Sequence, residues 1–260
     1  LSEPDAGSDT GSLRCKAEKD GDEWLINGTK MWVTNGTRAS LVMLLTRTPD
    51  DRITCFLVEK EPGENFEGIT VSKKIDKLGY RGLETVEMSY VDHRLPSENV
   101  LGGEDGIGNG RRYALSALEL GRINIAARAV GVAQAAFDAA INYSQQRETF
   151  GQPLANRQAI QWMLVDNEID IRTGRWACLA AADLAQRGEP FRFESSMAKL
   201  VSTEGAGRVV DRSMQIFGGL GMSKDLPLER WYRELRIRRI GEGPSEVQRI
   251  VMARDLLNIR

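Results

Sequence analysis

The sequence predicts an α+β, multidomain chain in which a small antiparallel β-domain is followed by an antiparallel four-helix bundle. Short apolar runs separated by glycine and proline fill the first hundred residues, which is typical of strands and turns. After Gly102-Gly103 the sequence becomes rich in alanine and other strong helix formers, and apolar residues recur at helical spacing. We therefore expect a β-domain at residues 1–104 and a helical domain at residues 105–260.

The strands are expected in chain order. The Asn27-Gly28 pair lies between two apolar runs of residues 23–33 and predicts a hairpin turn. Residues 41–46 and 53–58 are continuous apolar runs of strand length. Apolar and polar residues then alternate over residues 85–91, and this period of two predicts a half-buried strand. Together these strands favour a small antiparallel sandwich or barrel.

The helices are expected to be long and antiparallel. Apolar periodicity predicts helices at about residues 111–143, 155–187, 194–217 and 244–257, with a further arginine-rich helix at 228–240. Gly218-Gly219 is a helix-stop signal, and Pro244 is typical of a first helical turn. Four long antiparallel helices form a bundle.

Composition excludes several classes of protein. The chain has 35 basic and 37 acidic residues, so its net charge of −2 gives no attraction to nucleic acid or an anionic membrane. No apolar stretch reaches the about 18 residues that a membrane span needs. A single histidine, His93, excludes a multi-histidine metal site. The three cysteines, Cys15, Cys55 and Cys178, are widely spaced, which favours reduced thiols over a disulfide.

Three segments are candidates for ligand chemistry. Residues 2–9 combine hydroxyls, glycine and proline, and form either a ligand-binding loop or a simple connection. Trp32 and Thr34 place an indole beside a hydroxyl, which suits a planar ligand, although a core tryptophan is the alternative. Glu242 lies between two glycines just before a helix, where it is either a general base or a helix-capping residue.

Together these segments resemble the acyl-CoA dehydrogenases, in order and over the whole chain. Four further stretches match the family, at residues 77–79, 96–102, 147–151 and 215–219. The family has an N-terminal helical domain, a middle β-domain and a C-terminal helical bundle. The chain resembles the last two, so we expect the first domain to be absent from it.

The resemblance implies that FAD is the cofactor and that no metal is used. Thr34 matches a position near flavin N5, and the segments around Arg147 and Gln215 match positions that commonly reach the FAD of a neighbouring subunit. The positions that match FAD contacts are Leu1, Ser2, Trp32, Val33, Thr34, Arg147, Thr149, Phe150, Gln158, Gln215, Gly218, Gly219, Pro244 and Glu246.

The resemblance also implies an acyl-CoA substrate. The positions that match acyl-CoA contacts are Ser8, Glu119, Arg122 and Gly243. Glu242 matches the catalytic base, which removes the α-proton while flavin N5 accepts the β-hydride, giving the trans-2-enoyl-CoA. Some relatives place their base on the first bundle helix, at a position that is Gly121 here. Many relatives also carry threonine where this chain has Pro244.

As a member of that family, the protein would be a flavin-dependent oxidoreductase of fatty acid or branched-chain catabolism. The resemblance implies an electron-transfer flavoprotein as the acceptor, a homo-oligomer that is a tetramer, and the bacterial cytoplasm or the mitochondrial matrix as the compartment. Two alternatives stay open. One is an acyl-CoA oxidase on the same fold, and the other is a non-catalytic or partial flavin-binding fragment or partner subunit.

Overall fold

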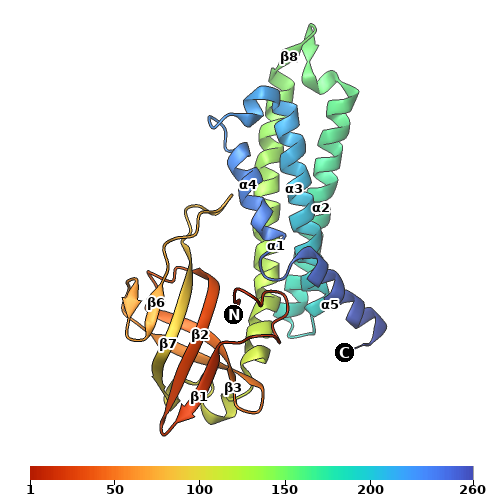
Figure 1. Cartoon of the computed structure of the whole chain (residues 1–260). Coiled ribbons are helices and arrows are strands. Elements are labelled where there is room, and N and C mark those ends of the chain that lie inside the picture. The colour runs from red at the N-terminus through yellow and green to blue at the C-terminus, as the bar shows by residue number, and fades with distance from the viewer. Residues whose placement is uncertain (260) are drawn as a thin grey trace. The chain divides into compact units, whose positions relative to one another are not determined.

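The computed structural model describes residues 1–259 and divides the chain into two compact units. Unit 1 contains residues 1–77 and 81–117, and unit 2 contains residues 78–80 and the chain from residue 118 onward. Figure 1 shows a strand-rich first part of the chain and a helical second part, as the sequence predicts.

Unit 1 is built on a single seven-stranded sheet with the order β4-β3-β1-β2-β7-β6-β5. The strands are β1 (Lys16–Asp20), β2 (Glu23–Thr34), β3 (Leu41–Thr48), β4 (Arg52–Glu59), β5 (Asn65–Phe66), β6 (Ile69–Val71) and β7 (Thr85–Pro96). Every pairing is antiparallel except that of β1 with β3, which is parallel. Phe56 of β4 and Ile69 of β6 lie far apart in the strand order but share one apolar core, so the sheet curves around that core.

The hairpin predicted at Asn27-Gly28 is wrong. Strand β2 continues through both residues, and the turn between β1 and β2 lies at Gly21-Asp22. At Gly28 the pairing of β2 with β7 shifts register, and the backbone has a φ of 142°. A Cβ atom at this position would lie 2.6 Å from the Cα of Cys15 on the segment that leads into β1. Gly28 therefore permits a bulge and a close backbone approach, which a local turn signal cannot distinguish from a hairpin.

Unit 2 is a helical bundle. Its elements are α1 (Gly110–Gln146, of which the first turns belong to unit 1), α2 (Gln158–Gln186), α3 (Arg192–Phe217), α4 (Leu228–Arg238), α5 (Ser245–Leu257) and a small hairpin of β8 (Glu148–Thr149) and β9 (Gln152–Pro153). The buried face of α1 is lined with alanines such as Ala126, Ala129 and Ala133, which share one apolar cluster with Ile171 of α2 and Val209 of α3. Small side chains on one stripe let the helices approach closely.

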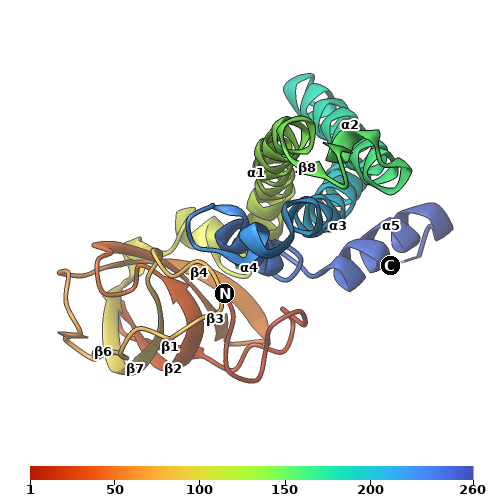
Figure 2. The same ribbon diagram turned by 90° about the horizontal axis from the view of Figure 1, so that it is seen from above.

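The fourth helix of the core is not the one expected. Leu228 and Leu235 of α4 belong to the buried apolar cluster of the bundle, whereas α5 contributes no side chain to it. The residues that α5 buries are Ser245 and Gln248, and Figure 2 shows the helix directed away from α1, α2 and α3. The apolar pattern of residues 244–257 thus correctly predicts a helix, but it does not predict that this helix lies outside the apolar core of the bundle.

Among the residues that the structure describes, no helix combines the length and the hydropathy that a membrane span requires. The three cysteines are buried, and none of them forms a disulfide within residues 1–259. Burial raises the pKa of the Cys15 thiol to about 11, so this thiol stays protonated at neutral pH.

Candidate active site

A strained bulge in β2 carries the tryptophan that the sequence singled out. The pairing of β2 with β7 shifts register between Lys30 and Val33, and Trp32 adopts a φ of 63°. A left-handed backbone is rare for a bulky residue and costs about 1–3 kcal/mol, so the surrounding structure must hold it. The backbone N–H of Met31 donates to the carbonyl of Ser2 at 2.9 Å, and the Trp32 side chain remains 55% exposed.

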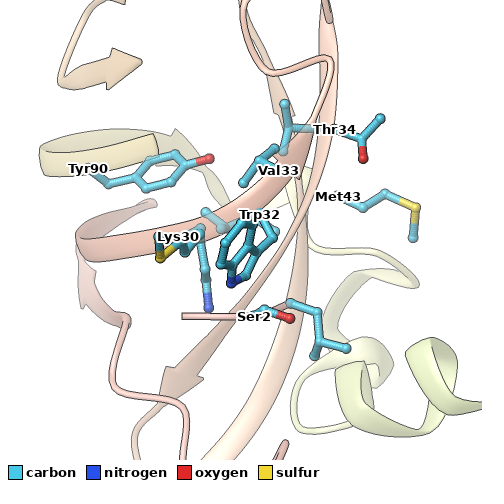
Figure 3. Close-up of a pocket in the computed structure, with 11 residues that line it drawn as sticks. Ser2, Lys30, Trp32, Val33, Thr34, Met43 and Tyr90 are labelled. Carbon is cyan, nitrogen blue, oxygen red and sulfur yellow. The ribbon is translucent and has the colours of Figure 1, made fainter. Parts of the chain in front are cut away.

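The bulge forms one wall of a pocket of about 250 Å³ in unit 1 (Figure 3). All five residues predicted to contact a flavin ring in the β-domain line this pocket, namely Leu1, Ser2, Trp32, Val33 and Thr34. Sequence reasoning missed other lining residues, among them Lys30, Met43 and Tyr90. An exposed indole beside two hydroxyls provides a flat apolar surface and polar groups for a planar heterocycle. Ser8 does not line this pocket and lies on an exposed loop.

One residue that lines the pocket, Lys30, belongs to a buried ion pair. The Nζ of Lys30 donates to Glu3 Oε1 at 2.6 Å, and both side chains are almost completely buried. Glu3 also accepts hydrogen bonds from the backbone N–H groups of Arg14 at 2.7 Å and Cys15 at 3.0 Å. Burial alone would raise the pKa of Glu3, but the hydrogen bond from Lys30 and the two backbone N–H groups outweigh it and hold the pKa below its ordinary value.

We expect Lys30→Met to lower the free energy of unfolding by about 3–5 kcal/mol, because it leaves the Glu3 carboxylate buried without its cation. The measurement is urea unfolding at pH 7. Lys16→Met, on the exposed face of β1, is the control and should change the stability by less than about 0.5 kcal/mol. The stabilisation from Glu3 is present above its unfolded pKa and is lost as the pH falls through its lowered folded pKa. Equal stability of the two variants would contradict this reading.

In unit 2 the loop between α4 and α5 presents Glu242. Two successive left-handed residues, Glu242 with a φ of 56° and Gly243 with a φ of 89°, turn the chain there. The Glu242 side chain is half-buried, and its Oε2 atom has no hydrogen-bond partner within the described residues. Burial raises the pKa of this carboxyl group, and this effect exceeds the opposite effect of the cations of Lys199, Arg122 and Arg128.

The space for the carboxylate comes from a glycine on α1. A Cβ atom added to Gly121 would lie 2.4 Å from Glu242 Oε2 and 3.1 Å from its Cδ. Any larger residue at position 121 would therefore displace the carboxylate. This contact joins the two positions at which the family resemblance places a base.

Two buried polar side chains hold the loop in place. The Nζ of Lys199 on α3 donates to the carbonyl of Gly243 at 2.7 Å, and the Nε2 of Gln248 donates to the same carbonyl at 2.8 Å. Burial lowers the pKa of Lys199 to about 8. Arg122, predicted to contact acyl-CoA, is also buried near Glu242 and donates to Ser196 Oγ at 3.3 Å. Sequence reasoning missed Lys199 and Gln248, although a lone lysine among the small residues of 195–206 was a signal for a buried cation.

The remaining predicted residues fall into other places of unit 2. Glu119 lines a shallow pocket with residues 188–192. Pro244 immediately precedes α5, and Glu246 lies exposed in its first turn. Arg147, Thr149, Phe150, Gln158, Gln215, Gly218 and Gly219 gather at the end of the bundle opposite to α5 (Figure 1). Gln215 lies sixteen residues after Lys199 on α3, or about 24 Å along the helix, so a single copy of unit 2 does not bring this group to Glu242.

Comparison with known proteins defines the class that this fold and site represent. Residues 1–92 match the middle domain of the acyl-CoA dehydrogenases, and residues 108–257 match their C-terminal domain. The chain belongs to the acyl-CoA dehydrogenase family.

Individual relatives agree. The mitochondrial short-chain specific acyl-CoA dehydrogenase of Bos taurus is 42% identical, over 99% of this chain and 62% of the relative. The butyryl-CoA dehydrogenase structure from Megasphaera elsdenii superposes with a TM-score of 0.92 at 37% identity, over 99% of this chain and 67% of that one. A chain in the electron transferring flavoprotein structure of Acidaminococcus fermentans gives 0.92 and 36% identity, with the same coverage. The chain thus spans 62% of the length of the curated relatives it matches first.

Proposed function

We propose that the protein catalyses the FAD-dependent α,β-dehydrogenation of an acyl-CoA thioester to the trans-2-enoyl-CoA. The observation that carries this proposal is the Glu242 carboxylate, which is half-buried, lacks a partner on Oε2 and lies in a glycine-flanked loop. Membership of the family supports it. The names of the bovine and Megasphaera relatives favour a short acyl chain.

Glu242 is the base in this proposal and removes the α-proton of the thioester. Because burial raises its pKa, the carboxylate is a stronger base than an exposed glutamate. The backbone N–H of Glu242 donates to no acceptor within residues 1–259, so it is free to donate to the thioester oxygen as negative charge develops there. One such oxyanion donor contributes about 3–4 kcal/mol to lowering the barrier. Gly243 and Arg122 would border the thioester.

FAD, when bound, supplies the acceptor for the β-hydride. The pocket of unit 1 suits the ring of this cofactor, because the Trp32 indole offers a flat surface and Ser2 and Thr34 offer hydroxyls. We propose that Leu1, Ser2, Trp32, Val33 and Thr34 hold the ring. Pro244 and Glu246, at the start of α5, would contact the same cofactor.

The proposed protein is a homotetramer, and two surface features of unit 2 support assembly with further copies. Phe150, at the tip of the β8–β9 hairpin, is 96% exposed, although its sequence motif matches FAD contacts across a subunit interface. Helix α2 also exposes an apolar stripe of Trp162, Val165, Ile169, Trp176 and Leu179, which recur at helical spacing on one face. Light scattering on the holoenzyme should give four times the mass of one subunit, and Trp176→Asp should reduce that mass. A monomer with a full complement of FAD would contradict the proposal.

The electron acceptor separates the proposed dehydrogenase from an oxidase. In the test, butyryl-CoA is added anaerobically to the full-length holoenzyme, and the flavin absorbance is followed. We expect bleaching by butyryl-CoA, rapid recovery with an electron-transfer flavoprotein and slow recovery in air. Rapid recovery in air would identify an oxidase, and the absence of bleaching would contradict acyl-CoA dehydrogenation. We propose the bacterial cytoplasm or the mitochondrial matrix as the compartment, because one relative is named mitochondrial and another comes from a bacterium.

The rate of flavin reduction should depend on pH through Glu242. The base must be ionised, so the rate should fall as the pH decreases through the raised pKa of Glu242. The Lys199 cation lowers that pKa, so Lys199→Met should raise the pKa and shift the falling limb to higher pH. Lys224→Met changes an exposed lysine of unit 2 and should leave the profile unchanged. Stopped-flow profiles of both variants test this, and an unshifted limb for Lys199→Met would contradict it.

A further inference from the structure

Two arginines of unit 2 face one tyrosine ring. The guanidinium Cζ of Arg238, on α4, lies 5.7 Å from the centroid of the Tyr80 ring, and that of Arg128, on α1, lies 6.0 Å from it. The backbone N–H of Tyr80 donates to Glu234 at 2.8 Å, and this bond holds the ring in place from α4. Two helices thus direct positive charge to one flat aromatic surface.

Within residues 1–259 neither arginine forms an ion pair, and the carboxylate that attracts Arg238, that of Glu234, already accepts the backbone N–H of Tyr80. The Nε and Nη1 atoms of Arg238 are buried without a hydrogen bond, and the residue is only 7% exposed. Two nearby arginines differ: Arg233 of α4 pairs with Glu229, and Arg239, which follows α4, pairs with Glu204. In the described part of the chain, no carboxylate forms an ion pair with Arg128 or Arg238. A guanidinium keeps its proton at physiological pH. A buried guanidinium without an ion pair would therefore be stabilised by an anion from outside the chain.

Arg128 lies on the face of α1 that accommodates the proposed base. Arg128 follows Gly121 on α1 by seven residues, which is two helical turns, and therefore projects from the same face about 10 Å further along the axis. Gly121 is the residue against which the Glu242 carboxylate lies. The charge of Arg128 also acts on Glu242. The same face of α1 thus accommodates the Glu242 carboxylate at Gly121 and presents the Arg128 cation two turns further along the helix.

We propose that Arg128 and Arg238 bind a carboxylate at the far end of the acyl chain, so that the preferred substrate is a short dicarboxylic acyl-CoA. This inference rests on the proposed function. With the α-carbon at Glu242, a short acyl chain would extend along α1 toward the arginine pair, and the Tyr80 ring would support the carboxylate end. Guanidinium forks match the paired oxygens of a carboxylate.

A phosphate of CoA or of FAD has the same anionic chemistry, and the experiment distinguishes the three sources. It compares the kcat/KM of the full-length holoenzyme for adipyl-CoA and hexanoyl-CoA, which have the same length and differ only in the terminal carboxylate. Glutaryl-CoA and pentanoyl-CoA form a second pair. The variants are Arg238→Gln and Arg128→Gln, and the control is Arg236→Gln, which changes an exposed arginine of α4. Bound FAD and the melting temperature are measured for each protein.

The wild type should prefer the dicarboxylic substrate of each pair, and each arginine variant should reduce that preference by roughly 10- to 100-fold, as expected for a charged hydrogen bond. The control should keep the preference. Arg128 is exposed, so its variant gives a readout even where Arg238→Gln lowers stability.

Equal use of both substrates by the wild type would overturn the inference and leave the proposed function standing. Equal losses for all substrates would assign the pair to a CoA phosphate, and loss of FAD would assign it to the cofactor. No flavin reduction by any acyl-CoA would overturn the proposed function itself.

Discussion

Replacing Glu242 by glutamine is expected to slow the reduction of bound flavin by acyl-CoA by about 10²–10⁴-fold, the usual contribution of a general base. Glutamine keeps the shape of the side chain but removes its basicity. The buried Oε2, which has no partner in residues 1–259, loses its negative charge without losing a structural contact, so folding should be unaffected. FAD content and acyl-CoA affinity should also change little, since the lost interaction belongs to the transition state.

The measurement is anaerobic stopped-flow bleaching of the flavin, with bound FAD quantified in the wild type and the variant. Glu18→Gln is the control, because Glu18 is an exposed glutamate of β1 that has no assigned part in the site. It should bleach within a few-fold of the wild type. Normal bleaching in the Glu242 variant would mean that another group takes the α-proton.

Gly121→Ala should reduce the rate of flavin reduction by about 10²-fold or more while leaving the protein folded. The added Cβ would lie 2.4 Å from Glu242 Oε2, so something must move. The atom in the way is the end of a flexible side chain, which moves at little cost in stability. That side chain is the proposed base, however, and a displacement of about 1 Å costs on the order of 10² in rate.

Gly131→Ala provides the control on the same helix, since a Cβ there meets no atom within 4 Å. It should leave the rate unchanged and stabilise the helix by up to about 1 kcal/mol. Flavin bleaching and thermal unfolding of both variants give the two readouts. Equal bleaching rates for the two alanine variants would show that the contact between Gly121 and Glu242 has no part in the reaction.

Local patterns in the sequence predict most of the elements of the fold. Helical periodicity identifies the five α-helices of residues 1–259. The same local reasoning fails at Gly28, where the relevant fact is the approach of Cys15 from another part of the chain. Local reasoning also assigns the wrong helix as the fourth helix of the core. The sequence patterns of α4 and α5 differ less than the elements against which the two helices pack.

The candidate site also contains some features that local sequence patterns predict and others that they do not. The glycines around Glu242 are visible in the sequence because backbone freedom at a helix entrance is a local property. The burial of Arg238 is not visible, because an arginine on a helix is ordinarily solvated or ion-paired. Arg233 and Arg239 are paired, whereas Arg238 is buried without an anion. Only the packing of the helices shows which charges are enclosed.

The carboxylate of Glu242 occupies the volume that a side chain at position 121 would fill. The two positions therefore compete for one space, and the family resemblance puts a base at either of them in different members. A single substitution at position 121 crowds the proposed base, and a single substitution at position 242 removes it. Evolution from one arrangement to the other thus requires two compensating changes, with a poorly active intermediate between them. The historical order of these changes is accordingly constrained, and the base is expected to remain at one position within a lineage over long times.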